Sequence, residues 1–368
     1  MLMTQPVLDA LDLAHRDPLP RQTRPPDPHA AARARALDLA AACFSARVVH
    51  LAAELCLADA LVDGPLDAAA LAARTGTHAD ALERLLRTLT ALGLLTHGSD
   101  GRFALTDGGH ALRSDGPSSA RAGIRVMSLW WETWSALEHS LRSGEAAADV
   151  VLGKPAFDHI GEDPDRLALF QEGMRGLNAR TLPHVVEAIG DLGAASIVDV
   201  AGGHGSLLAA VLHASPRAHG LVVDRPEVVA EGRAYLAGQG LGDRAQITGG
   251  DMFRAVPAGA DVYLLKWILH DWDDADCVRL LRVLRSAMRP DSRLLVVDRV
   301  MPDRVRAGAD HLRMQLSDLR MLAALGGRER TLSAFERIFS EAGLELVARA
   351  PTPCELHVLT VRRGPEVP

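Results

Sequence analysis

The chain has 368 residues, a net charge of −7 and an apolar fraction of 48%. This length exceeds one ordinary core and predicts two domains, and the composition is that of a globular protein rather than a disordered one. The acidic balance argues against nucleic acid as the main partner, because phosphate binding needs a basic face.

The cysteines and the apolar runs indicate the compartment. The four cysteines are scattered and none forms a C-x-x-C pair, which argues against a zinc site and a disulfide framework. No long apolar run occurs, so we expect no signal peptide, no membrane span and no membrane partner. These features fit a reduced, cytoplasmic protein.

Residues 1–28 are rich in Pro, Asp and Arg, which predicts a mobile tail. A short helix over Val7–Ala14 is an option within it, and it would pack on a partner.

Residues 29–115 have the pattern of a winged-helix module. Apolar residues recur at three- and four-residue spacing from about His29 to Leu55. The other predicted elements are helices over Ala68–Thr75 and Ala79–Leu92, and two short strands over Leu94–Thr96 and Arg102–Leu105. Such modules bind DNA or form dimers. The third helix carries Glu83 beside Arg84 and Arg87 and is not strongly basic, which favours dimerisation.

Residues 116–190 read as a helical linker that lines a substrate pocket. It contains three tryptophans, which are either core residues at helical spacing or an aromatic wall over a flat substrate. With the segment after residue 300, the linker supplies the candidate substrate residues Trp130, Trp134, Phe157, Phe170, Met174, Asn178, Met314, Asp318 and Met321. Flexible methionines beside aromatic rings suit flat ligands.

Residues 191–368 change to strand–helix alternation. The predicted strands are Ser196–Val200, His219–Asp224, Ala245–Gly249, Val262–Leu265, Arg293–Val300, Glu345–Ala350 and Glu355–Val361. Helices are predicted between the first five, for example over Gly205–His213 and Cys277–Met288. This pattern predicts a seven-stranded, mostly parallel, Rossmann-like sheet. The last two strands form a hairpin, so one of them should be antiparallel.

The sequence SIVDVAGGHGSL at 196–207 predicts a ligand turn at the carboxyl edge of the sheet. A dinucleotide motif is disfavoured, because Leu208 stands where the third glycine would be. Asp199, Asp224 and Asp251 follow three successive strands. Each alone is often a solvated loop residue or a helix cap, but the ordered series is typical of a nucleoside site, with Asp224 placed for the ribose hydroxyls.

The stretch LLKWILHDWDD at 264–274 contains one of only two lysines, Lys266, and the pair His270-Asp271. An isolated histidine is more often a satisfied core residue than a catalytic one, and Lys266 taken alone is an ordinary strand-end residue. Asp271, Asp273 and Asp274 can simply cap the next helix or orient the loop.

Taken together, VDVAGGHG, VVDRP, GDMF, LLKWILHDWDD, VVDRVMPD and DLRMLAALGGRERT resemble the class I S-adenosylmethionine-dependent small-molecule O-methyltransferases, of the plant phenolic and actinobacterial polyketide type. AAELCLADAL and LERLLRTLTALGLL match the N-terminal pattern of the same family. The resemblance spans about residues 35–360. It implies a homodimer formed through the N-terminal domain and a small aromatic substrate.

Residue by residue, the resemblance implies positions that bind the cofactor, and it implies no metal site. It implies that Gly202, Gly203 and Gly205 cradle the methionyl part, Asp224 holds the ribose, and Lys266 contacts the cofactor; the adenine is framed by Asp251, Met252 and Phe253. Ala201 departs from the family's three glycines, and we expect its methyl group to be tolerated if φ is negative there.

The resemblance also implies the chemistry. His270 is the general base, and Asp298 and Glu329 are its supporting carboxylates, Asp298 being shorter than the usual Glu. The predicted activity is in-line methyl transfer to a phenolic hydroxyl. Alternatives are N- or C-methylation, a homologue that keeps the cofactor for other chemistry, and a DNA-binding regulator.

Overall fold

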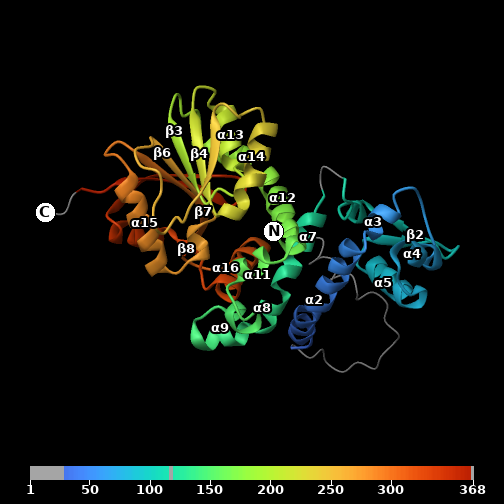
Figure 1. Ribbon diagram of the computed structural model, residues 1–368. Coiled ribbons are helices and arrows are strands. Elements are labelled where there is room, and N and C mark those ends of the chain that lie inside the picture. The colour runs from blue at the N-terminus through green and yellow to red at the C-terminus, as the bar shows by residue number, and fades with distance from the viewer. Residues whose placement is uncertain (1–28, 116–118, 366–368) are drawn as a thin grey trace. The chain divides into compact units, whose positions relative to one another are not determined.

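The computed structural model describes residues 29–115 and 119–365. The tail predicted over 1–28, with its optional helix Val7–Ala14, lies outside the described residues. The chain forms two compact units (Figure 1). The first extends to Leu129 and includes Asp165–Gly176, so it is larger than the expected 29–115, and the second holds the rest.

The first unit contains the three helices and the wing. Its elements are α2 (Ala30–Glu54), α3 (Leu57–Ala60), α4 (Ala68–Thr75), α5 (Ala79–Ala91), β1 (Leu95–His97), β2 (Phe103–Leu105), α6 (Asp107–His110) and α7 (Arg121–Met127). Asp67 caps α4, because its side chain accepts a hydrogen bond from Ala70 N at 2.8 Å. Leu71, Leu86 and Phe103 are buried in its core.

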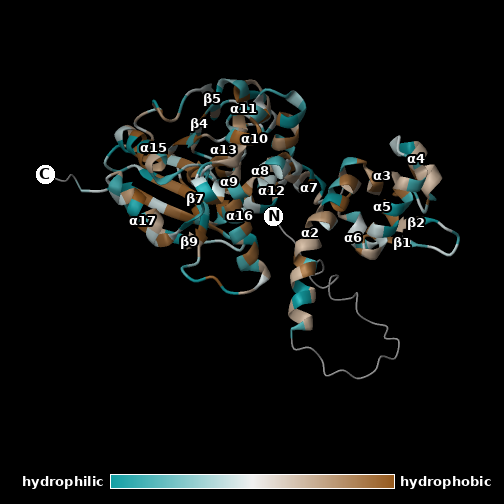
Figure 2. Ribbon diagram, turned by 90° about the horizontal axis from the view of Figure 1, so that it is seen from below, coloured by the Kyte–Doolittle hydropathy of each residue, from teal (hydrophilic) through white to brown (hydrophobic). Residues whose placement is uncertain are grey.

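Helix α2 leaves apolar side chains uncovered between Leu37 and Phe44. Leu37 is 65% exposed and Phe44 is 73% exposed, and Figure 2 shows apolar residues distributed along α2. By length and composition alone this one helix could cross a membrane, which the sequence reading did not anticipate. A soluble partner that covers the same face satisfies its hydrophobicity equally well.

A chain of short helices precedes the sheet. These are η1 (Ser128–Trp130), α8 (Trp131–Ser135), α9 (Leu137–Ser143), α10 (Ala147–Val151), α11 (Ala156–Gly161) and the long α12 (Pro164–Ile189). Helix α12 contributes residues to both units. Within the second unit, α8 and α10 pack against a later helix, α16 (Ala309–Leu325).

The second unit is built on the predicted sheet. Its remaining elements are β3 (Ser196–Val200), α13 (Ser206–Ala214), β4 (His219–Asp224), η2 (Pro226–Val228), α14 (Val229–Gly238), β5 (Ala245–Gly249), β6 (Val262–Lys266), η3 (Leu269–Asp271), α15 (Asp274–Ala287), β7 (Arg293–Met301), β8 (Arg330–Thr331), α17 (Leu332–Glu341), β9 (Leu344–Pro351) and β10 (Leu356–Arg363). The seven predicted strands are confirmed. The two-residue β8, which pairs with β7, was missed.

The strand order β5-β4-β3-β6-β7-β10-β9 places the ligand edge. Strands β3 to β7 are parallel, and β10 is antiparallel to β7 and β9, as the hairpin predicted. The chain leaves β3 in one direction and β6 in the other. Right-handed crossovers then put α13 and α14 on one face and α15 on the other (Figure 1). The carboxyl ends of β3 and β6 flank this switch point, where such sheets bind ligands.

The residues that follow β3 and β6 have left-handed backbones. Ala201 has φ 55° and Trp267 has φ 56°. The condition under which the Ala201 methyl group was expected to be tolerated, a negative φ, is therefore not met. A Cβ in this region contacts the backbone and costs about 1–2 kcal/mol. Strain of this kind persists where the surrounding structure determines the conformation.

Ala201→Gly should raise the free energy of unfolding by up to about 1 kcal/mol, because it removes the Cβ strain and loses only part of that gain to chain entropy. Ala209→Gly, in the regular helix α13, is the matched control and should cost about 1 kcal/mol. Urea unfolding of both variants measures the difference. Equal losses at the two positions would contradict the strain at Ala201.

Candidate active site

The turn after β3 is shaped by Asp199 beneath it. Asp199 is buried and accepts a hydrogen bond from Leu208 N at 3.3 Å. A Cβ at Gly202 would lie 2.5 Å from the Asp199 carboxylate, so only glycine fits there. Burial raises the pKa of Asp199 to about 7, although the bond from Leu208 opposes this. The carboxylate thus holds the turn close to the end of the strand.

Asp224, at the end of β4, faces the same turn. One carboxylate oxygen accepts from Gly203 N at 2.6 Å and the other from Arg225 N at 2.7 Å. Burial raises its pKa, and the two backbone donors counteract that rise. Each oxygen keeps a further lone pair, so the group can still accept hydrogen bonds from a vicinal diol.

The segment after β5 presents one acid and two apolar side chains. Asp251 accepts from Phe253 N at 2.9 Å and is exposed, while Met252 is partly buried against the main core. The Phe253 ring packs edge-on against Trp272 at 4.7 Å and is covered by Arg279. The placement suits a planar heterocycle next to a hydrogen-bond acceptor.

Lys266, the last residue of β6, lies in a short polar chain. Its Nζ donates to Asn178 Oδ1 at 2.6 Å, and Asn178 Nδ2 donates to Ser206 Oγ at 2.8 Å. Burial lowers the pKa of Lys266 to about 7, against the attraction of Asp199. Asn178 was predicted among the substrate residues, and the structure places it beside Lys266 and the start of α13.

His270 sits on η3, a turn held from several sides. Arg330 is 1% exposed and donates to Leu269 O at 2.5 Å, Trp272 O at 2.8 Å and Asp274. The Cys277 thiol lies 3.1 Å from Leu269 O. Gly327 packs on the other side, where a Cβ would lie 2.2 Å from His270 O. These contacts hold the backbone that carries His270, independently of any contact to the imidazole ring.

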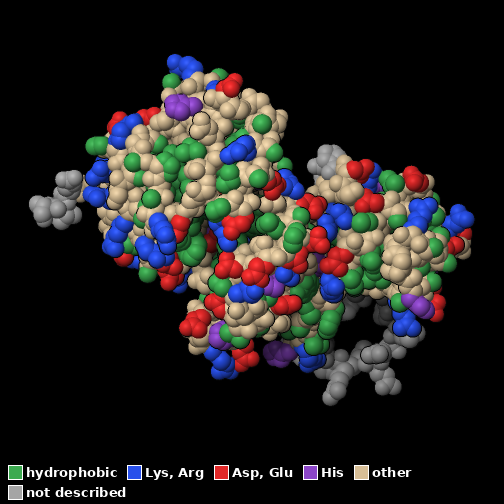
Figure 3. Space-filling view, viewed as in Figure 1, with side chains coloured by type: hydrophobic (Ala, Val, Ile, Leu, Met, Phe, Trp, Pro, Cys, Tyr) green, Lys and Arg blue, Asp and Glu red, His purple; other side chains and the backbone are tan. Residues whose placement is uncertain are grey.

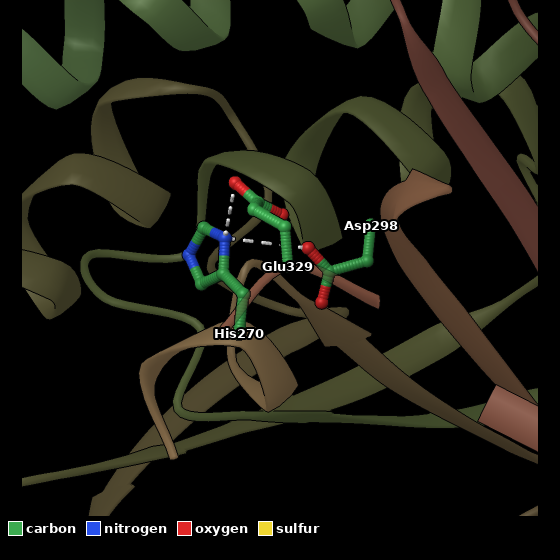
Figure 4. A group of neighbouring side chains, drawn as sticks. All are labelled: His270, Asp298 and Glu329. Carbon is green, nitrogen blue, oxygen red and sulfur yellow. Dashed lines mark ion pairs between the residues drawn. The ribbon is translucent and has the colours of Figure 1, made fainter. Parts of the chain in front are cut away.

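The His270 ring lies between carboxylates. Figure 4 shows Asp298 and Glu329 directed toward Nδ1, at 3.5 and 3.4 Å. Asp271, on the same turn, lies 3.3 Å from Nε2. The two acids that sequence reasoning assigned to His270 are therefore beside it, both at ion-pair distance, and Asp271 is a third. Among the described residues, His270 Nδ1 and the two Asp298 oxygens have no hydrogen-bond partner. Asp273 has the capping role foreseen for this loop and accepts from Asp276 N.

The carboxylates decide the charge of the ring. Burial alone would lower the pKa of His270, but Asp298, then Glu329 and Asp271, outweigh it and raise the pKa to about 9. Burial raises the pKa of Asp271 to about 7 and that of Asp298 to about 6. Burial acts in the same direction on Glu329, but His270 and Arg299 hold its pKa below the usual value. The surrounding carboxylates thus favour the protonated imidazole.

Sequence reasoning missed the groups that complete this network. Arg299 donates to Glu329 Oε1 at 3.0 Å, and the Ser317 hydroxyl donates to the same oxygen at 2.8 Å. Asp318, which was predicted as a substrate residue, accepts from Glu329 N at 2.8 Å. Arg299 and Arg330 each follow an acid that had been singled out, in VVDRV and RERT, and that adjacency was the available signal.

The same three side chains also have the donor set of a cation site. His270, Asp298 and Glu329 offer one nitrogen and two carboxylate oxygens, all within 4.8 Å of one another. Two carboxylates and an imidazole can bind a divalent metal. They equally form a histidine oriented by acids, so composition alone does not separate the two uses.

The other predicted substrate residues are spread over several helices. Asp318, Met321 and Met314 lie on α16, which packs against η3 and against α8, the helix that carries Trp134. Trp130 is 7% exposed, which favours a core role for it. Phe157 is on α11, and Phe170 and Met174 lie on the part of α12 that belongs to the first unit.

Two surface features lie apart from this cluster. A hollow lined by Ser196, His219, Asp243 and Ala258 lies at the amino ends of β3 and β4, away from His270. Figure 3 shows acidic and basic side chains interspersed on the visible face. A continuous basic surface of the kind that binds nucleic acid is not seen on that face.

Known proteins match this chain over both units. An O-methyltransferase domain matches residues 134–345, and an O-methyltransferase dimerisation domain matches residues 37–115. The mitomycin biosynthesis 6-O-methyltransferase of Streptomyces lavendulae is 40% identical over 348 residues, covering 92% of this chain and 98% of that protein.

Two solved structures are similar over nearly their whole length. The mitomycin 7-O-methyltransferase MmcR aligns with a TM-score of 0.86 and 39% identity, over 91% of this chain and 99% of its own. The neocarzinostatin O-methyltransferase NcsB1, solved with S-adenosylmethionine and 2-hydroxy-5-methyl naphthoic acid, aligns at 0.78 with 31% identity, over 87% and 96%.

These matches agree with the site geometry. The glycine turn, the acid at the end of β4 and Lys266 lie on the edge where a nucleoside-containing cofactor binds. The family models cover the sheet as well as the helical module. The chain belongs to the O-methyltransferase family with an N-terminal dimerisation domain, and it is an O-methyltransferase that uses S-adenosylmethionine.

Proposed function

We propose that this enzyme methylates a phenolic hydroxyl of an aromatic natural product, with His270 as the general base. The observation that carries the proposal is the buried imidazole between carboxylates, four residues beyond Lys266 at the end of β6. The relatives named above act on mitomycin precursors, and the NcsB1 structure holds a hydroxynaphthoic acid, which supports an aromatic acceptor.

The described geometry supports the cofactor residues that the family resemblance implied. Gly202, Gly203 and Gly205 form the turn for the methionyl part, and Asp224 accepts the ribose hydroxyls. The adenine lies against Asp251 and its neighbours Met252 and Phe253, and Lys266 contacts the cofactor. When bound, S-adenosylmethionine supplies a methyl group on a cationic sulfonium, and the protein contributes alignment, worth about 7–11 kcal/mol in favourable cases.

His270 would have to remove a proton from a weakly acidic phenol. A phenol has a pKa of about 10, so little phenolate is present at neutral pH. With a pKa of about 9, His270 is a stronger base than free imidazole. It must first lose its own proton, and a cationic sulfonium nearby would help by disfavouring the imidazolium. Asp298 and Glu329 then hold Nδ1–H and leave Nε2 as the atom that accepts the phenolic proton, once Asp271 yields its place.

The acceptor contacts remain a proposal. Trp134, Phe157, Asp318 and Met321 are the residues that we place around the ring, with Asn178 shared with the cofactor side. An amine acceptor would need less help from a base. The extent of the carboxylate network around His270 therefore favours a hydroxyl.

His270→Gln should lower turnover by about 10²- to 10⁴-fold, because a positioned general base contributes that much. Binding of S-adenosylmethionine should change little, since His270 is not among the cofactor residues. Isotopically labelled methyl donor measures turnover, and calorimetry measures binding. Near-normal turnover would remove the base and leave alignment as the mechanism.

A chelator distinguishes the general-base role of His270 from a metal site. Prolonged dialysis against a chelator should leave turnover unchanged if His270, Asp298 and Glu329 act as an oriented base. A loss that added zinc or magnesium restores would assign the three side chains to a cation instead.

Asp298→Asn should shift the pH dependence. Neutral imidazole is the active form, so kcat/KM should rise with pH up to about 9 in the parent enzyme. Removing the Asp298 charge lowers the pKa of His270, so the rising limb should move to lower pH. Asp303→Asn, at an exposed position, is the control and should leave the profile in place. An unshifted limb in Asp298→Asn would contradict the role of this carboxylate.

We also propose that the stretch of α2 from Leu37 to Phe44 packs against a second copy of the chain. The dimerisation domain match begins at Leu37, and Leu37, Leu39 and Phe44 are exposed. An uncovered apolar stripe of this kind marks a protein or membrane contact. The family match favours the protein contact.

Phe44→Asp should convert dimers to monomers, because it puts a charge into the apolar contact. Val347→Asp, at an exposed apolar position on β9, should remain dimeric. Sedimentation velocity distinguishes the two species. If the parent chain is monomeric and floats with lipid vesicles, the stripe on α2 binds membrane instead.

A further inference from the structure

Arg320, on α16, is a cation near His270 without a described counter-ion. Among the described residues, its side chain makes one hydrogen bond, from Nη2 to Ser317 Oγ at 3.4 Å. Its Nε is buried and has no hydrogen-bond partner. Among the residues that the structure describes, no carboxylate oxygen lies within the 4.0 Å of an ion pair with it. Arg299 and Arg330, by contrast, pair with Glu329 and Asp274.

Such a side chain is unusual, because buried guanidinium groups are normally paired and hydrogen-bonded. Burial lowers the pKa of Arg320, and the like charge of Arg299 adds to that effect. The attraction of Glu329 and Asp271 opposes it only from a distance. Part of the Arg320 side chain remains accessible, so a ligand can reach it.

The position of Arg320 connects it to the acceptor. Helix α16 packs against η3, which carries His270. The two carboxylates that attract Arg320, Glu329 and Asp271, are the ones that contact the two ring nitrogens. A ring whose hydroxyl meets His270 therefore lies near the guanidinium. A guanidinium offers a planar fork of donors that fits a carboxylate with two hydrogen bonds.

We propose that Arg320 binds a carboxylate on the substrate, so that the preferred acceptor is an aromatic hydroxy acid. The inference rests on the proposed phenolic methyl transfer and adds the substrate class. A neutral phenol would leave the Arg320 donors unsatisfied, and sites built to bond a polar group discriminate strongly against analogues that lack it. The hydroxynaphthoic acid in the NcsB1 structure has this chemistry, in that protein.

The test compares matched acceptors with the full-length enzyme. The probes are a hydroxynaphthoic acid and a hydroxybenzoic acid, each beside its methyl ester, with labelled methyl donor. The parent should prefer the acids by at least about tenfold in kcat/KM. Arg320→Leu should lower kcat/KM for the acids by about 10- to 200-fold, mainly through KM, and leave the esters unchanged. Arg320→Lys should recover part of the loss, and Arg362→Leu, at a 57% exposed position on β10, should change neither.

A binding measurement separates this inference from the proposed chemistry. A naphthoate that lacks the hydroxyl cannot be methylated. In calorimetry with the demethylated cofactor product present, this naphthoate should bind to the parent enzyme and not to the Arg320→Leu variant. The inference would be overturned if Arg320→Leu lowered kcat/KM equally for acids and esters, or if naphthoate bound to Arg320→Leu as it does to the parent. Arg320 would then be a distant counter-charge for Asp271 and Glu329. Failure of every acceptor despite naphthoate binding would instead count against phenolic methyl transfer.

Discussion

A buried group of opposite charges around His270 determines much of this fold. Three carboxylates surround the imidazole; Arg299 pairs with one of them, Glu329, and Arg330 pairs with Asp274 beyond the same turn. Each ion would be costly to bury alone, and removing one partner from such a pair typically costs about 3–5 kcal/mol. The elements that bring these groups together, β6, β7, α16 and the turn before β8, therefore have little freedom to move apart.

Contacts to the backbone also hold the turn that carries His270 in place. The turn that carries His270 lies between Gly327 on one side and the Cys277 thiol on the other. Arg330 then ties three points of the same segment together. Glu329 and Arg330 are adjacent, and one contacts the imidazole while the other holds its backbone. Within the segment GGRER, Glu329 thereby positions the imidazole ring of His270, and Arg330 positions the turn that carries it.

Most of the sheet could be predicted because its strands are short, apolar and separated by clear turns. Ser196–Val200 and Ala245–Gly249 begin and end where the pattern placed them. Strand β8 was missed because two residues carry no periodicity. Ala201 was misjudged because a torsion angle depends on the tertiary environment. Arg299, Arg320 and Arg330 drew no attention because arginine is the ordinary cation of this chain, and only burial and pairing distinguish them.

The hydrogen bond from Lys266 to Asn178 has a practical consequence. An ordinary surface amine is protonated and therefore unreactive at neutral pH, whereas burial brings the pKa of Lys266 to about 7. The chain contains one other lysine, Lys154, which is bonded to the exposed Glu162. Burial thus makes the Lys266 amine easier to deprotonate than that of Lys154, and the same burial limits the access of acylating reagents to its Nζ. Its labelling would report, without any acceptor, whether the methyl donor occupies the protein.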